Sequence, residues 1–546
     1  MRWRSPRCGP GARRVSSQGA AMKAATIRTF QTVHTWTGLL AGFALFVAFY
    51  AGALVVFHDD IAAWQNPPWR SAVDADVPVD ALIERLLASH PAAREDFGIV
   101  LPTDPSHAAY AYWQDGDDTR FATASQMDAP RAEAGADELA DYIYALHDSL
   151  GLPVFGLYLM GIVSVLYGLA LVSGIVIHLP QLLQNIFAMR VGPNLKRLWQ
   201  DAHNAIGVLS LPFHVIFAVT GALFCLLTLT LAALNTVAFD GQLFGAFAHA
   251  TQTTPAVTAS GTPASMLPPE ALIARARTEA FTSGVTTFKP DYLHFVHYGD
   301  HNAVAEVRGL SQHTLGTFGS VALSAHDGSV LGNHVGNRYS LNGISYAALF
   351  GLHFGTFGGR TVQWLYFVLG LAGAFLFYSG NLLWIESRRK RRVADQPLRT
   401  LVMARATIGV CIGTCLGIAG AFAATWVSAR LGVDAGLPQR VACYGLFFAA
   451  CAYASIRPVA RATAELLWMT AALTVLVATA DLAGNASAIA RAWTPLTWSV
   501  LGVDLTGIAM GIVFACFARA SARRARSGDA NSVWSLQAAS TSRSSP

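Results

Sequence analysis

Long apolar runs alternate with polar stretches along this chain. Runs of roughly 20 residues lie at about 33–57, 153–178, 204–235, 354–385, 401–428, 440–457, 463–482 and 496–518. A helix rises about 1.5 Å per residue, so runs of this length can cross the hydrocarbon of a bilayer. The pattern therefore predicts eight membrane-spanning helices.

The composition supports a multi-pass membrane protein. Of 546 residues, 53% are hydrophobic and only 13% are charged, so most apolar surface must face lipid or other helices. The formal charge of +5 comes from Lys and Arg spread over short loops. This distribution is typical of membrane topology signals, and the sequence contains no nucleic-acid-binding motif, so no nucleic-acid partner is expected.

The short loops that carry the basic residues all fall on one side of the predicted helices. They precede the first run, join runs two to three, four to five and six to seven, and follow the eighth. Because basic loops stay inside, we expect both termini in the cytoplasm. The two long hydrophilic loops, 59–150 and 236–352, would then face the periplasm from a bacterial inner membrane.

The chain ends and the cysteines add little to this picture. Residues 1–25 and 521–546 are rich in Arg, Ser or Gly, and we expect a disordered leader and a disordered tail. The two outward loops contain no cysteine, so disulfides do not hold them together.

The first part of the chain is duplicated. His147 stands 27 residues before Gly174, and His353 stands 27 residues before Gly380; each of these glycines follows a serine. His34 and His203 each begin a His-x3-Gly motif and stand 18 residues before Gly52 and Gly221, respectively. The duplication predicts two equivalent units of the same orientation, related by a pseudo-two-fold axis along the membrane normal.

Each outward loop has the pattern of a small α+β domain. Pro78 and Pro268 lead short amphipathic helices, and alternating strand-like runs follow at 109–113, 292–297, 303–308 and 320–324. We therefore divide the chain as follows: leader 1–25, helix one 26–58, outward domain 59–150, helices two and three 151–235, outward domain 236–352, helix four with its basic loop 353–392, an accessory four-helix region 393–520, and the tail 521–546.

Equivalent histidines at helix ends are candidate haem ligands. A low-spin b-type haem takes two neutral imidazoles on opposite faces of its iron. In a duplicated bundle, His34 with His203 would hold one haem and His147 with His353 a second. No Cys-x-x-Cys-His motif is present, so we expect two non-covalent haems. Interfacial anchoring of these histidines is the alternative.

Three further histidines are weaker candidates for haem ligation. His214 lies near the middle of the third run, where polar groups are usually functional. His58 and His178 end the first two runs. None of the three has a histidine at the equivalent repeat position, which holds Leu45, Leu227 and Trp384, respectively.

The motifs together resemble the PepSY-associated transmembrane family, which includes iron-regulated inner-membrane proteins and ferric-siderophore reductases. The resemblance rests on His34-x3-Gly38, His203-x3-Gly207, Thr220-Gly221-Ala222-Leu223, the Leu352-His353 to Gly358-Gly359 junction and the two Pro-led loops, over residues 26–392. It implies an all-α polytopic membrane protein with two small periplasmic α+β PepSY-like domains. The four additional helices depart from the family pattern.

The resemblance also implies a function. The chain would be an inner-membrane di-haem b-type oxidoreductase, a ferric-chelate reductase that passes electrons to a periplasmic ferric siderophore and releases Fe(II). Its electron donor would be a quinol or a cytoplasmic reductase, because no dinucleotide-binding fingerprint is present. The alternative is a non-enzymatic membrane sensor or inhibitor whose outward domains bind envelope peptides or proteins.

Overall fold

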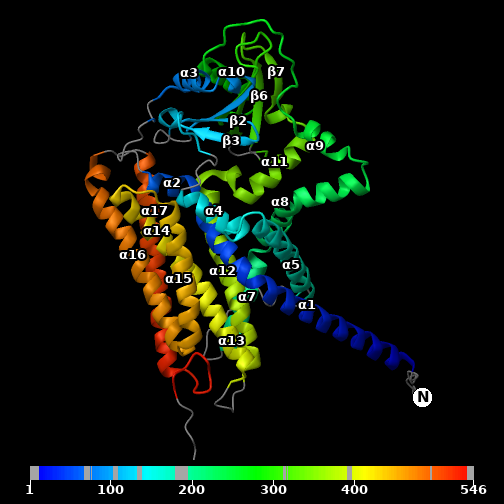
Figure 1. Cartoon of the computed structure of the whole chain (residues 1–546). Helices are drawn as coiled ribbons and strands as arrows, with labels where there is room; N and C mark the ends of the chain where they lie inside the picture. Colours follow the sequence, from blue (N-terminus) through cyan, green and yellow to red (C-terminus); the bar gives the residue numbers. More distant parts are fainter. Residues whose placement is uncertain are drawn as a thin grey trace, which may run out of the picture.

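The structure is a computed structural model of the whole chain. It describes residues 11–66, 74, 77–102, 108–131, 138–178, 195–311, 315–316, 318–389, 396–491 and 495–537. A long helical bundle carries one sheet domain at one end, and both ends of the described part of the chain lie toward the opposite end of the bundle (Figure 1). We call these ends the sheet side and the far side.

The duplicated half of the bundle contains four of the helices long and apolar enough to span a membrane. They are α1 (Gly11–Val55), α5 (Phe155–His178), α8 (Leu211–Val237) and α12 (Gly359–Arg388). The third run is interrupted: α7 (Leu195–Leu209) ends before Ser210, which is the N-cap of α8, and Pro212 lies in the first turn of α8. Short helices α4 (Leu139–Ser149) and α11 (Leu341–Phe354) precede α5 and α12 on the sheet side.

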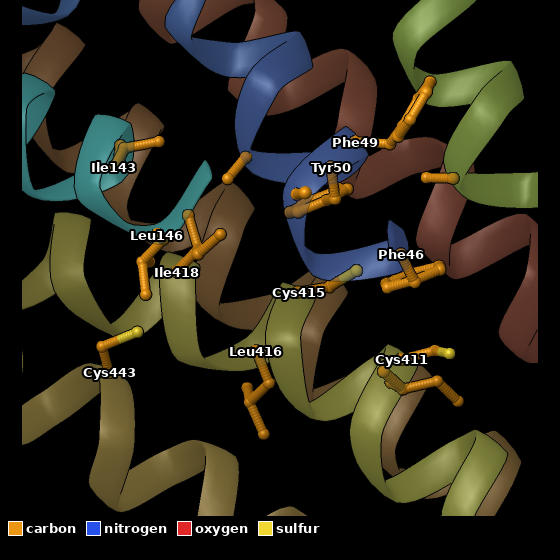
Figure 2. Close-up of a cluster of buried hydrophobic side chains, with 14 of the residues drawn as sticks. Phe46, Phe49, Tyr50, Ile143, Leu146, Cys411, Cys415, Leu416, Ile418 and Cys443 are labelled. Atoms are coloured by element: carbon orange, nitrogen blue, oxygen red, sulfur yellow. The ribbon is translucent and has the colours of Figure 1, made fainter. Parts of the chain in front are cut away.

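The accessory half packs beside it. Its helices are α13 (Leu398–Thr407), which continues through a π-helical turn into α14 (Gly413–Leu431), then α15 (Gly436–Ile456), α16 (Val459–Arg491) and α17 (Pro495–Ser527). Figure 2 shows how the halves join: Phe46 and Tyr50 of α1 lie beside Cys411 and Cys415 in a buried apolar cluster. Apolar side chains, many of them small or aromatic, thus form the junction between the two halves.

Seven helices in the described chain, not eight, are apolar enough to span a membrane. The run that does not qualify is the sixth, 440–457, which corresponds to α15; Gln439 and Arg440 in the first turns of this helix lower its hydropathy. Nevertheless, α15 packs along α14 within the bundle. The chain is therefore a multi-pass membrane protein, and α15 keeps the number of bundle passages even, in line with both ends lying on the far side (Figure 1).

The outward loops do not form two separate domains, as the sequence suggested. They share one seven-stranded antiparallel sheet in the order β3-β2-β1-β4-β5-β6-β7. The first loop supplies β1 (Asp96–Val100), β2 (Tyr110–Asp115) and β3 (Asp118–Ala122), and the second supplies β4 (Phe288–Val296), β5 (Val304–Ser311), β6 (Phe318–Ser324) and β7 (Val330–His334). Pairing of β1 with β4 removes the edge that each half-sheet would otherwise expose.

The two Pro-led helices are present as predicted. α3 (Val79–Ser89) and α10 (Pro269–Thr282) begin after Pro78 and Pro268, respectively. Both bury apolar residues against one face of the sheet, where Phe97 and Phe295 stack with ring centroids 5.1 Å apart. Two small helices, α2 (His58–Gln65) and α9 (Leu243–Thr251), connect the spans to the sheet domain.

The prediction of disorder at both ends of the chain was wrong for the residues that the structure describes. Helix α1 already begins at Gly11, and α17 runs to Ser527. Beyond it, the buried indole of Trp534 packs into the helical core. Trp534 is a large apolar residue in an otherwise polar segment, and the average composition of that segment hid this signal. Residues 1–10 and 538–546, and residues 390–395 of the basic loop, lie outside the described residues.

Candidate functional site

On the far side of the bundle, the structure brings two equivalent histidines together. His34 of α1 and His203 of α7 have ring centroids 6.2 Å apart with ring planes at 80°. The Nδ1 atom of His34 lies 2.8 Å from the carbonyl oxygen of Ala170, and that of His203 lies 3.1 Å from that of Leu376. Because a carbonyl oxygen only accepts, both Nδ1 atoms carry the proton. Each Nε2 therefore keeps a lone pair.

The duplicated Ser-Gly motif explains how these rings fit. The hydroxyl oxygens of Ser173 and Ser379 lie 3.5 and 3.3 Å from Nδ1 of His34 and His203, respectively. A Cβ atom at Gly174 would be 3.2 Å from Cε1 of His34, and one at Gly380 would be 3.4 Å from Cε1 of His203. The small residues thus let α5 and α12 approach the imidazoles closely, at matching positions in the two units.

On the sheet side, His147 of α4 and His353 of α11 form the second pair. Their ring centroids are 5.9 Å apart, with ring planes at 52°. His147 Nδ1 donates to the carbonyl oxygen of Ala48 at 2.8 Å. His353 Nδ1 lies 2.7 Å from the hydroxyl oxygen of Thr220, which itself donates to the carbonyl of Ile216. The Thr220 oxygen must therefore accept, and His353 takes the same tautomer as the other three histidines.

Gly52 makes room for the sheet-side pair. A Cβ atom at this position would lie only 2.5 Å from His147 Nδ1. Its repeat counterpart, Gly221, instead faces Ser164, whose hydroxyl oxygen would be 2.9 Å from an added Cβ. The two units are therefore alike in their histidines and helix order, but they differ in the residues that contact the sheet-side imidazoles.

Aromatic rings fill the interior between the two pairs. Phe217 lies 4.9 Å from His353 by ring centroids and 5.9 Å from Phe49, which in turn lies 5.1 Å from Phe377. Phe377 also contacts Tyr167, at 5.5 Å. This stretch of the bundle core is apolar and closely packed, which excludes water between the pairs.

His214 lies in this aromatic interior and is fully buried. Its Nδ1 is 2.6 Å from the hydroxyl of Tyr167 and its Nε2 is 2.9 Å from the hydroxyl of Ser210. Both ring nitrogens are occupied, so His214 is satisfied by neighbouring helices. The structure does not bring it together with either histidine pair as a third ligand.

His58 lies apart from the pairs, whereas His178 lies near the far-side pair. His58 Nε2 is 2.9 Å from Asp141 and its Nδ1 is 3.3 Å from Asp59. Burial lowers the pKa of His58, but these carboxylates outweigh burial and raise the pKa to about 10. A protonated imidazole has no lone pair for a metal. His178 is the last residue of α5, partly buried, and it lies close enough to His34 and His203 to interact with both electrostatically.

The four paired histidines fit the ligand set of two haems. Metal–imidazole bonds are about 2 Å long, so two imidazoles on opposite faces of one iron have ring centroids roughly 6 Å apart. Both pairs have this spacing. Anchoring of Nδ1 by an acceptor is the usual way in which a protein fixes the tautomer and orientation of a metal-binding histidine. Among the described residues, no hydrogen bond reaches any of the four Nε2 atoms.

Arg360 is not available as a simple propionate partner, a role that its place after His353 suggests. Its guanidinium binds both carboxylate oxygens of the buried Asp60, with Nη2 2.9 Å from Oδ1. The sequence contained no signal for this pair, because Asp60 and Arg360 are far apart in the chain and lie in different repeat units.

The sheet domain contains a separate charged cluster, centred on Glu306, which is fully buried. The hydroxyls of Thr253 and Thr254 and the guanidinium of Arg308 donate to its carboxylate. Burial alone would raise the pKa of Glu306, but His294 and these donors hold it well below its usual range. Among the described residues, no three His, Cys, Asp or Glu side chains form a group that could hold a metal ion.

Comparison with known proteins agrees with the repeat. Residues 31–387, more than half of the chain, match the PepSY-associated TM region. An uncharacterized protein of Pseudomonas aeruginosa is 25% identical over 285 residues, covering 50% of this chain and 69% of that protein. The matched family region contains all four paired histidines and ends before α13. The chain therefore belongs to the PepSY-associated transmembrane family.

Proposed function

We propose that this chain is a di-haem b-type oxidoreductase that reduces a ferric siderophore and releases Fe(II). The best support is that four imidazoles form two pairs, with ring centroids 6.2 Å apart in one pair and 5.9 Å apart in the other. In every ring, Nδ1 is hydrogen bonded to an acceptor. Haem bound there would supply one-electron transfer, which no side chain of the chain provides.

The contribution of the protein is to hold each imidazole neutral and fixed. Ala170, Leu376, Ala48 and Thr220 accept from Nδ1 and leave Nε2 as the only ligand atom. The surrounding apolar helices exclude water, which limits reorganisation when the charge of a bound group changes. A haem on each pair would place one redox centre toward each end of the bundle.

The sheet-side pair is well placed for a substrate outside the membrane. His147 and His353 lie on α4 and α11, the helices that lead from the sheet domain into α5 and α12. We place the sheet domain in the periplasm of a bacterial inner membrane, with both termini in the cytoplasm. A ferric siderophore would then be reduced beneath the sheet. Reduction loosens iron because hard oxygen donors prefer Fe(III) to Fe(II).

Stopped-flow oxidation of the purified, dithionite-reduced protein tests this function. Ferric hydroxamate and catecholate chelates are mixed with it in the presence of an Fe(II) trap, without oxygen. We expect chelate-dependent oxidation of haem with stoichiometric Fe(II), and slower oxidation after His147→Ala or His353→Ala than after the surface control His301→Ala. Full haem occupancy without chelate-dependent oxidation would refute the reductase proposal, and absence of haem would favour the sensor alternative.

A further inference from the structure

A long hollow seam separates the duplicated half from the accessory half. One cavity of about 640 Å³ lies on the sheet side, between α1, α2 and α12 on one wall and α14, α16 and α17 on the other. A second cavity of about 570 Å³ lies toward the far side of the same seam. Tyr50 and Met510 line both cavities, so the two cavities are neighbours along the same seam.

The two ends of the seam differ in chemistry. The sheet-side cavity contains the Asp60–Arg360 ion pair and Asp504, a buried carboxylate that accepts from the indole nitrogen of Trp64 at 2.9 Å. The aromatic rings of Phe57, Trp364 and Phe367 contact one another in its wall, with centroids 4.8 to 5.7 Å apart.

The far-side cavity is mainly apolar. Its walls include Phe46, Leu371 and Phe514, and its lining contains neither Asp nor Glu but does include Arg524. A ligand that fills the whole seam must therefore have a polar aromatic head at one end and a long apolar chain at the other.

The seam lies against the helices that hold the histidine pairs. Tyr50 lines the cavity, while its neighbour Phe49 packs against Phe217 on the histidine side of α1. Phe367 lines the cavity, while its neighbour Tyr366 hydrogen bonds to the carbonyl of Leu352, beside His353. Only the thickness of a helix, about 10 Å with side chains, separates the two regions.

We propose that this seam binds a membrane quinol, which is the electron donor of the chain; the donor role rests on the proposed function. The quinol ring lies between the aromatic wall and the carboxylates, and the isoprenoid chain extends toward the far-side cavity. Quinol hydroxyls donate to Asp504 or Asp60, and the carbonyls of the oxidised quinone accept from donors such as Arg360. The accessory half, which the family pattern lacks, thus completes a donor site.

The redox step balances with two haems and two ferric chelates. One quinol loses two electrons and two protons and becomes a quinone. Haems held by the four paired histidines would take up these two electrons one at a time, and two ferric chelates on the sheet side would accept them as two Fe(III) become two Fe(II). The two protons leave from the quinol oxygens through the carboxylates at the sheet-side end. Two one-electron acceptors suit a two-electron donor.

Charge argues against a phospholipid as the intended occupant. Asp60 and Arg360 neutralise each other, and the carboxylate of Asp504 leaves the polar end without excess positive charge for a phosphate. The aromatic walls also suit a flat ring better than a flexible glycerol head group.

A steric block in the sheet-side cavity tests the proposal in the full-length protein. Gly502 of α17 lines this cavity, and a Cβ atom there would meet nothing within 4 Å, so Gly502→Leu fills the cavity without a backbone clash. Gly445→Leu on α15 is the matched control, because it also has open space and does not line the seam. Asp504→Asn is a second variant that retains the size of the side chain.

Two measurements separate binding from electron transfer. Decylubiquinone and a short-chain menaquinone are titrated while tryptophan fluorescence is followed, since Trp64, Trp364 and Trp498 line the cavity. Reduction of bound haem by the corresponding quinols is followed by stopped flow. We expect Gly502→Leu to weaken quinone binding at least about tenfold, and Asp504→Asn to slow haem reduction by quinol, while Gly445→Leu matches the parent chain.

The outcomes distinguish this proposal from the reductase function. Intact chelate-dependent haem oxidation with no saturable quinone binding, or with binding that Gly502→Leu leaves unchanged, would overturn the quinol site and leave the reductase standing. A phospholipid that remains bound at one per chain in native mass spectrometry, and that quinone does not displace, would also overturn it. Quinone binding lost only in Gly502→Leu would support the site even if ferric chelates do not oxidise the haem.

Discussion

The imidazole rings of His147 and His353 lie with their centroids 5.9 Å apart, although they come from short helices of different repeat units. Neither ring is held by the other. Instead, His147 donates to Ala48 of α1 and His353 to Thr220 of α8, so each ring is oriented by its own unit. Two separately oriented imidazoles at this distance fit the proposal of a ligand shared between the units.

Filling the space beside His147 should remove one haem. In Gly52→Leu, the new Cβ would lie 2.5 Å from His147 Nδ1 and displace the ring. We expect about half of the haem to be lost, because the His34–His203 pair stays intact. Pyridine haemochrome analysis of the purified protein measures this.

Gly38→Leu is the matched control for this substitution, since Gly38 lies on the same helix and nothing stands within 4 Å of its Cβ position. Equal haem content in Gly52→Leu and Gly38→Leu would argue against His147 as a ligand.

The weaker histidine candidates should be dispensable for haem. His58 is held by Asp141 and Asp59, and both ring nitrogens of His214 are hydrogen bonded. We therefore expect His58→Gln and His214→Gln to retain both haems, although His214→Gln should lower the melting temperature because it disturbs a buried network. Loss of a whole haem in either folded variant would show that the substituted histidine is required for haem binding, against the present ligand assignment.

Stability of the sheet domain should fall at alkaline pH. Burial lowers the pKa of His294, but Asp96 and Glu306 outweigh burial and raise it from 6.5 to about 9. A raised pKa means that the stabilisation is fully present below pH 6.5 and is lost as the pH rises through 9. The shift sets an upper bound of about 3 kcal/mol. Solvent around Asp96, whose side chain is 60% exposed, reduces this to about 1–2 kcal/mol.

Thermal unfolding by circular dichroism at pH 6.5 and 9.5 checks this dependence. The difference between the two pH values should shrink in His294→Gln and persist in His326→Gln, a control in the same domain. An equal pH dependence in all three proteins would rule out the His294 contribution.

The far side of the bundle should face the cytoplasm, and α15 should cross the membrane. A periplasmic reporter inserted at Gly261, which is exposed in the sheet domain, should be active. In a background without the native cysteines, Val433→Cys, between α14 and α15, should react with an impermeant maleimide in intact cells. Ser455→Cys, near the end of α15, should react only after the membrane is opened. Labelling of both positions from outside would mean that α15 does not span.

Sequence patterns predicted much of the fold because duplication and membrane crossing leave strong periodic signals. Seven of the eight expected spans, both Pro-led helices and the strands near Tyr110, Tyr292, Val304 and Ser320 are present. The single shared sheet could not be predicted, because the pairing of Gly98 with His294 joins loops that are distant in sequence. Strands β1, β3 and β7 were not predicted; each is only five residues long.

The same reasoning predicted which histidines lie side by side but not what orients them. His34 and His203, like His147 and His353, had a repeat signal. The acceptors at Ala170 and Leu376 are backbone carbonyls, which any residue type can provide, so the sequence carries no signal for them. The Asp60–Arg360 pair and the hollow seam depend on how the two halves pack, and neither follows any motif.

The absorption spectrum of the purified protein, oxidised and dithionite-reduced, assigns each haem to its histidine pair when it is recorded for single histidine variants. We expect a low-spin b-type spectrum with about two haems per chain. We also expect that His34→Ala and His203→Ala lose one spectral component, and that His147→Ala and His353→Ala lose the other. A folded protein without haem, or loss of different components within one pair, would contradict this assignment.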